Sequence, residues 1–150
     1  MNTSTVFSRL AALVAAALLS ACASGPKFAA PESPSSDKAV LYIYRAGGFY
    51  GAVLKHTARV AGSPVGTLVN ASYLRTTVDA GAVAPVQLEG CGALAQLTPS
   101  AGNTYYVQAS ITNKNTVSGG GNVTIHLGCV LAQRTQAEAL PVITGLSRAD

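Results

Sequence analysis

The chain has 150 residues and a mass of 15.1 kDa, which is enough for one small domain. Charged residues make up only 11% of it and the mean hydropathy is +0.33, so the composition excludes an intrinsically disordered protein. No apolar run reaches the ~18 residues of a spanning helix, which excludes a polytopic membrane protein. The formal net charge is +4, and an odd number of cysteines, three, remains to be assigned.

The first 21 residues have the pattern of a secretory signal. Arg9 precedes an apolar run over 10–19, which is too short to span a bilayer but suits the hydrophobic region of a signal peptide. The sequence LSAC at 19–22 resembles the bacterial lipobox, in which the cysteine carries diacylglycerol before the signal peptidase cuts. We therefore predict a signal peptide over 1–21 and an anchor at Cys22, held in the membrane by acyl chains such as palmitate.

The residue after the anchor cysteine bears on the destination. By resemblance to Gram-negative lipoproteins, a residue other than Asp here, Ala23, permits sorting to the outer membrane, so we expect the domain to face the periplasm. Eleven of the sixteen residues over 23–38 are Ser, Pro, Ala or Gly, and Phe28 is the lone aromatic. This composition predicts a flexible but extended tether over 22–37 that holds the domain several nanometres from the lipid.

Eight short segments with strand character follow, separated by turn residues. We expect strands over 39–45, 52–60, 65–69, 72–78, 83–89, 93–97, 104–112 and 122–131. Short strands at regular intervals predict an all-β fold over 38–134, an antiparallel β-sandwich or small barrel of seven to eight strands. Only 132–140, before Pro141, could form a short helix, and 135–150 is expected to be a C-terminal extension.

Alternation in the last two strands separates an inward from an outward face. Val107 and Ala109 share one face, with Tyr106 on the other, and Cys129 shares the inward face of its strand with Leu131. The other candidate core residues are Val40 or Leu41, Ile43, Leu54, Val60, Leu68, Leu74, Val78, Val86, Leu88 and Leu97.

Several of these segments are similar to a known family. They are LYIYR at 41–45, VAG at 60–62 with VGTL at 65–68, SY at 72–73, DAG at 79–81 and AGNTYYV at 101–107. Over positions 39 to 131 the chain resembles the small bacterial lipoproteins of domain of unknown function 2846, although Ala80 stands where that family has a proline. The resemblance implies a β-rich extracytoplasmic domain and carries over no catalytic residue.

Two cysteines remain once Cys22 is assigned to the anchor. In an oxidising periplasm an even pair usually forms a disulfide, so we expect a bridge between Cys91 and Cys129. The alternative is a zinc site that adds His56 and His126. The spacing disfavours zinc, because neither cysteine lies in a C-x-x-C knuckle and the histidine at 126 falls on the face opposite its neighbouring cysteine.

Few residues could perform acid–base catalysis. The only acids between 38 and 134 are Asp79, in a turn, and Glu89, at a strand end, and the chain has no G-x-S-x-G elbow. A small periplasmic hydrolase would need His56, His126 and Asp79 to converge in one cleft. We expect instead a protein that is not an enzyme and needs no cofactor or metal.

The positive charge lies mostly in the domain, where seven cations and two acids between 38 and 134 give a net charge of +5. Lys55 and Arg59 share a strand face, and with Arg75 they form a candidate anion-binding patch; scattered solubilising charges are the alternative. We predict a module that binds an envelope protein or an anionic wall or lipid component through loops 46–51 and 113–121. A purely structural lipoprotein is the alternative, and export excludes nucleic acid as a partner.

Overall fold

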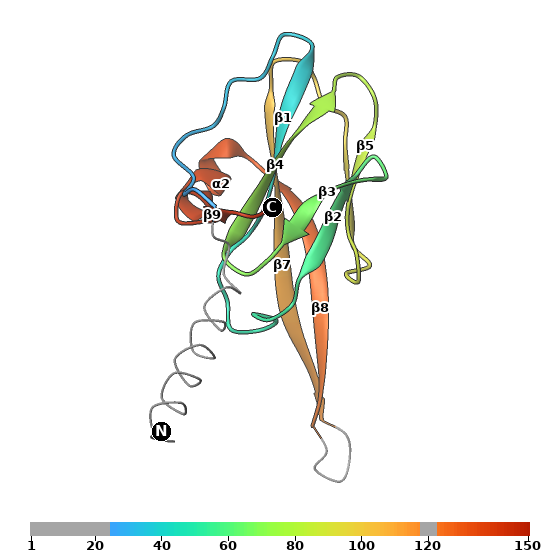
Figure 1. Cartoon of the computed structure of the whole chain (residues 1–150). Coiled ribbons are helices and arrows are strands. Elements are labelled where there is room, and N and C mark those ends of the chain that lie inside the picture. The colour runs from blue at the N-terminus through green and yellow to red at the C-terminus, as the bar shows by residue number, and fades with distance from the viewer. Residues whose placement is uncertain (1–24, 118–122) are drawn as a thin grey trace, which may run out of the picture.

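The computed structural model describes residues 25–117 and 123–150 (Figure 1). Among them it contains nine strands and one short helix. The strands are β1 Lys38–Arg45, β2 His56–Val60, β3 Ser63–Leu68, β4 Ser72–Asp79, β5 Ala84–Leu88, β6 Leu94–Leu97, β7 Thr104–Val117, β8 Val123–Arg134 and β9 Ser147–Arg148, and the helix α2 is Gln136–Ile143. All eight strands expected from the sequence are present, although β2 begins at His56 and residues 52–55, expected in that strand, lie in the preceding loop; β9 is additional.

The strands form two facing sheets, so the prediction of an all-β sandwich is confirmed. One sheet has the order β8-β7-β1-β4-β9 and the other the order β3-β2-β5-β6. Most neighbours are antiparallel, but β1 pairs with β7 and β4 with β9 in parallel. The parallel pairs are possible because long stretches of chain separate the paired strands, whereas a tight hairpin can join only antiparallel ones.

The main core lies between the two sheets, where alternate residues of each strand point inward. Most of the expected core residues are buried there, and the half-buried side chain of Cys129 packs against them. This core includes Leu41, Ile43, Val60, Leu68, Leu74, Val78, Val86, Leu88, Leu97, Val107 and Leu131.

A second core covers the outer face of the five-stranded sheet, which the local sequence pattern did not predict. Strand β1 is buried on both faces, since Val40, Tyr42 and Tyr44 point away from the main core into this second cluster. Tyr106 also lies there, and its ring stacks on Tyr42 with the centroids 5.6 Å apart. The cover comes from the N-terminal segment, residues 25–37, and from α2.

The N-terminal segment packs on the domain, which corrects the expectation of a free tether up to residue 37. Phe28 is only 5% exposed, and its ring makes edge contacts with Tyr42 at 5.3 Å and Tyr73 at 5.5 Å. Glu32 adds an ion pair to Arg75 at 3.0 Å. A buried aromatic side chain removes a large apolar area from water, which favours docking over a free tether.

The C-terminal residues also belong to the domain rather than extending beyond it. Ala139 and Ile143 of α2 are buried in the cluster on the outer face, together with Leu146. Figure 1 shows α2 beside the five-stranded sheet. The carbonyl of Asp150 accepts a hydrogen bond from the Thr67 backbone at 2.9 Å, which ties the end of the chain to β3. Residues 135–150 are therefore part of the fold, which continues beyond residue 134.

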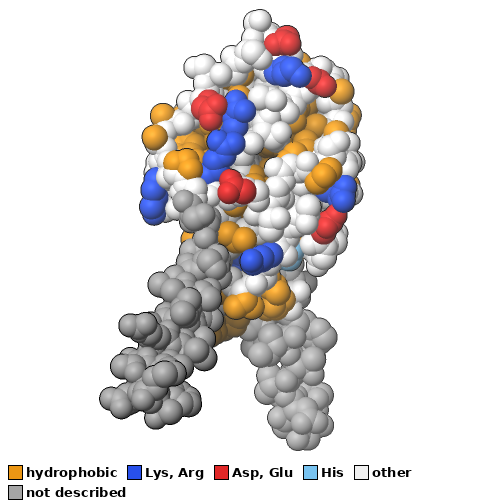
Figure 2. All heavy atoms as spheres, in the orientation of Figure 1, with side chains coloured by type: hydrophobic (Ala, Val, Ile, Leu, Met, Phe, Trp, Pro, Cys, Tyr) orange, Lys and Arg blue, Asp and Glu red, His pale blue; other side chains and the backbone are white. Residues whose placement is uncertain are grey.

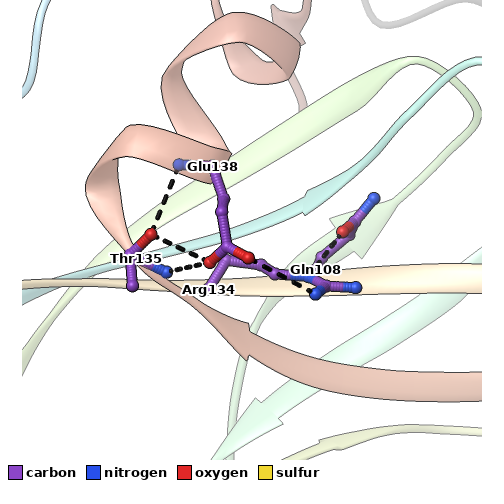
Figure 3. Close-up of polar contacts among 4 residues, drawn as sticks. All are labelled: Gln108, Arg134, Thr135 and Glu138. Carbon is purple, nitrogen blue, oxygen red and sulfur yellow. Dashed lines mark hydrogen bonds and ion pairs between the residues drawn. The ribbon is translucent and has the colours of Figure 1, made fainter.

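Helix α2 starts later than the expected 132–140 because β8 continues to Arg134 and Thr135 caps the helix (Figure 3). The Thr135 side chain accepts from the backbone N–H of Glu138, whose carboxylate accepts from the Thr135 backbone at 2.9 Å. Arg134 donates to Gln108 at 2.9 Å and so joins this capping box to β7. Pro141 lies inside the helix, in its last turn, rather than ending it.

A disulfide between Cys91 and Cys129 joins the sheets, as the sequence predicted. Cys91 lies in the β5–β6 turn of the four-stranded sheet and Cys129 in β8 of the five-stranded sheet, with their Cα atoms 5.3 Å apart. This separation is typical of a disulfide. The bridge closes one side of the sandwich, where β6 and β8 come together.

Candidate functional site

The β1–β2 loop, residues 46–55, folds around a buried arginine at the end of β1. Arg45 is only 2% exposed, and its guanidinium donates to the carbonyl oxygens of Leu54 at 3.0 Å, Gly51 at 2.6 Å and Tyr50 at 3.4 Å. These bonds come from a charged donor, which makes them stronger than bonds between neutral groups. Arg45 therefore holds the loop backbone in one place.

No carboxylate among the described side chains pairs with Arg45. Burial lowers the pKa of its guanidinium. An arginine still keeps its proton in a protein, so the group remains a cation under the loop. Among the described groups, the carbonyl dipoles of the loop are the hydrogen-bond partners of this buried charge.

The loop backbone lies close to β7 at Gly51. Its φ of +68° lies in the left-handed region that glycine adopts readily. A Cβ at this position would lie 2.9 Å from the Ile111 side chain and 3.2 Å from Leu54, closer than ordinary contacts. A larger residue would have to push the loop away from the sheet.

The tip of the loop presents apolar side chains to solvent. Phe49 is 91% exposed, Val53 88% and Tyr50 50%, and the two aromatic rings meet edge to face at 5.7 Å. Figure 2 shows hydrophobic side chains gathered at the lower end of the described body, where Figure 1 places this loop. Single exposed apolar residues are ordinary, but a cluster held on a fixed backbone is typical of an interaction surface.

A groove of about 420 Å³ runs beside the loop. Its walls are Ala52–Lys55 from the loop, Val69–Ala71 from the β3–β4 turn, and Lys27 with Gly145 and Ser147 from the two ends of the chain. Lys27 and Lys55 are its charged residues, and no acid lines it. The site thus combines an exposed apolar tip with a basic groove.

The three residues of the predicted anion-binding patch do not come together. Lys55 lines the groove, whereas Arg59 lies on the outer face of the four-stranded sheet and Arg75 on the outer face of the other sheet. Both arginines pair with acids, Arg59 with Glu89 at 2.6 Å and Arg75 with Glu32 at 3.0 Å. Even spacing along one strand defines a face of that strand, but it cannot show that two strands belong to opposite sheets.

Hydrogen bonds lower the pKa of two exposed glutamates. A hydrogen bond from the Arg59 side chain, with a smaller one from Thr57, holds the pKa of Glu89 below its usual value. In the helix cap, hydrogen bonds from the Thr135 backbone and side chain lower the pKa of Glu138. Both groups are exposed and each has a structural partner, which accounts for the shifts without catalysis.

The described residues do not assemble the hydrolase site considered above. His56 is buried with Nδ1 2.9 Å from the Glu89 carbonyl oxygen, and its Nε2 has no hydrogen-bond partner among the described atoms. Asp79 pairs with Lys38 at 3.0 Å, at the opposite end of β1 from the loop. The structure describes the backbone of His126 in β8 but not its side chain, and Cys22 and 118–121 lie outside the described residues.

Within residues 25–117 and 123–150, no group of three His, Cys, Asp or Glu side chains is placed to hold a metal ion. None of the helices described there is long and apolar enough to cross a membrane.

Sequence reasoning found the exposed end of the loop and missed the residues that support it. The expected contact surface, 46–51, contains Phe49 and Tyr50, but Arg45 was assigned only as the end of a strand. An arginine that directly follows an uninterrupted apolar strand was the available signal. Lys27 could not be foreseen because it lies in the segment predicted to be a tether.

No family model, curated protein or solved structure matches this chain. Its class is therefore defined by the fold and the site: a disulfide-linked all-β sandwich with an exposed apolar loop at one end.

Proposed function

We propose that this chain is an outer-membrane lipoprotein whose β-sandwich faces the periplasm and binds an envelope protein or an anionic lipid or wall component, without catalysing a reaction. The lipobox at 19–22 supports the anchor, and Ala23 supports the destination. The resemblance of 39–131 to the lipoproteins of domain of unknown function 2846 agrees with both.

The β1–β2 loop is the observation that favours binding. Its backbone is fixed by Arg45 and by close contact with β7, while Phe49, Tyr50 and Val53 are left in solvent. A preformed apolar surface loses little conformational entropy when a partner covers it. Loops held by a rigid sandwich commonly serve as binding surfaces.

The anchor is tested by expressing the full chain in a Gram-negative host and measuring the mass of the N-terminal peptide. We expect a diacylglycerol-modified Cys22 in the outer-membrane fraction, a Cys22→Ser variant without lipid, and an Ala23→Asp variant in the inner-membrane fraction. An unmodified cysteine in the exported protein would refute the anchor.

Binding is tested with a photo-reactive side chain in place of Tyr50 in the cell envelope. The matched control carries the same group at Val83, which is 60% exposed and lies at the other end of the sandwich. We expect a cross-linked product from position 50 and none from position 83. Equal cross-linking from both positions, or none from either, would contradict a binding role for the loop.

A further inference from the structure

The place where the described chain begins lies close to the exposed loop. Gly25 donates its backbone N–H to the carbonyl of Arg148 at 3.2 Å, and Lys27, two residues later, forms a wall of the groove that Val53 and Lys55 line from the other side. Cys22 is three residues before Gly25, so even a fully extended chain spans at most ~11 Å between them. An acyl chain on Cys22 must therefore enter the bilayer near this groove.

Two exposed lysines that have no acidic partner among the described side chains lie at the same groove. Four ion pairs among the described side chains occupy Lys38, Arg59, Arg75 and Arg134. The other cations with described side chains are the buried Arg45, the half-buried Arg148, and Lys27 and Lys55, which line the groove. Lysine and arginine side chains near a bilayer surface are attracted to anionic headgroups.

The apolar side chains of the loop suit the same environment. Phe49 and Tyr50 are aromatic, and aromatic rings concentrate at the headgroup level of membranes, where one part of the ring can be buried and another hydrated. A Cys22 that carries diacylglycerol already anchors the chain stably, because two acyl chains are sufficient. Contacts of the loop and of the two lysines beside the anchor would therefore fix how the domain lies on the leaflet.

We propose that the β1–β2 loop docks on the phospholipid leaflet that carries the anchor, with Phe49, Tyr50 and Val53 in the headgroup region and Lys27 and Lys55 facing lipid phosphates. The proposal rests on the lipidation of Cys22 proposed above and names the partner of the loop. The domain then lies against the membrane instead of standing off from it, because 25–37 is docked on the sandwich and only the short stretch before Gly25 can act as a spacer.

Tryptophan fluorescence can test this placement, because the chain contains no tryptophan. We would reconstitute the purified lipidated full chain, carrying Phe49→Trp, in vesicles of phosphatidylethanolamine and phosphatidylglycerol. The matched control carries Val83→Trp, which replaces another exposed apolar residue. Val83 lies near Lys38, at the start of β1. At a rise of about 3.3 Å per residue, this end of the strand is about 23 Å from Arg45.

We expect the emission of the tryptophan at position 49 to shift to shorter wavelength and to be quenched by brominated lipids, and the emission at position 83 to remain that of a hydrated side chain. Adding Lys27→Gln and Lys55→Gln to the Phe49→Trp protein should reduce the quenching, most clearly in vesicles rich in phosphatidylglycerol. Both mutated lysines are exposed, so the fold is expected to be kept.

The outcomes separate this proposal from the one on which it rests. If the protein floats with the vesicles but position 49 is no more quenched than position 83, the docking is refuted and the anchor stands; a protein cross-linked to position 50 would then be the partner of the loop. If mass measurement shows no lipid on Cys22 and the protein does not float, the anchor itself is refuted, and the docking falls with it.

Discussion

Removal of the bridge between the sheets should have the largest single effect on stability that the structure allows us to calculate. The Cys91–Cys129 disulfide closes a loop with a sequence separation of 38 residues. Loss of loop-closure entropy in the unfolded chain then stabilises the fold by about 4 kcal/mol at 25 °C. A typical domain is stable by only ~5–15 kcal/mol, so a Cys91→Ala/Cys129→Ala variant should remain folded but with a much smaller margin.

Urea unfolding of the lipid-free chain starting at Ala23 measures this effect, because that form contains no other cysteine. With a urea dependence near 2 kcal/mol per molar, the unfolding midpoint should fall by about 2 M. Reductant should bring the wild type to the midpoint of the variant and leave the variant unchanged. A loss of stability below about 1 kcal/mol, or a variant that responds to reductant, would refute the reasoning.

Phe28→Ala should lower the free energy of unfolding by about 3–4 kcal/mol because it empties a buried aromatic site. Phe49→Ala, at an exposed position, should change this free energy by less than about 0.5 kcal/mol. Equal effects of the two substitutions in urea unfolding would contradict the docking of the N-terminal segment. Arg45→Met should lower the free energy of unfolding by about 2 kcal/mol, because the loop carbonyls lose their hydrogen-bond donor. It should also accelerate proteolysis within 46–55. An unchanged cleavage rate there would show that the loop does not depend on the guanidinium. The pKa values of Glu89 and Glu138 are lowered in the folded chain, so both carboxylates stabilise the fold fully above the unfolded pKa near 4.5, and this stabilisation is lost as the pH falls through the lower folded pKa. Glu89→Gln and Glu138→Gln should therefore each lose less stability than the wild type when urea unfolding is compared at neutral and acid pH. Equal losses would refute these assignments.

Local chemistry explains why the strands and the disulfide could be predicted. Turn residues such as Gly62, Gly81 and Gly102 have positive φ in the structure, and each lies between segments that the sequence marks as strands. The disulfide was predicted from the expected compartment and the number of cysteines, because predicted export implies an oxidising environment and the predicted anchor uses one of the three cysteines. Neither prediction requires knowledge of how distant segments pack.

The second core could not be predicted in this way. Tyr106 alternates with Val107 along β7, so the local pattern assigns it to an outward face, and it does point away from the main core. Its burial depends on Phe28 and Ile143, which lie far from it in the sequence. Segments from the two ends of the chain bury this face of the sheet, and the alternation of residues along β7 does not reveal that they do so.

The candidate site, like the fold, could be predicted from the sequence only in part. Composition and motif by themselves predicted export, an anchor at Cys22, a strand-rich chain and a glycine-rich loop after the first strand. Tertiary structure alone decided that Arg45 turns inward to hold that loop, that Arg59 and Arg75 lie on opposite faces, and that Lys27 and Lys55 share one groove. The reason is that periodicity assigns a side chain to a face of its own strand, whereas the meeting of two faces depends on how the sheets pair and which segments cover them.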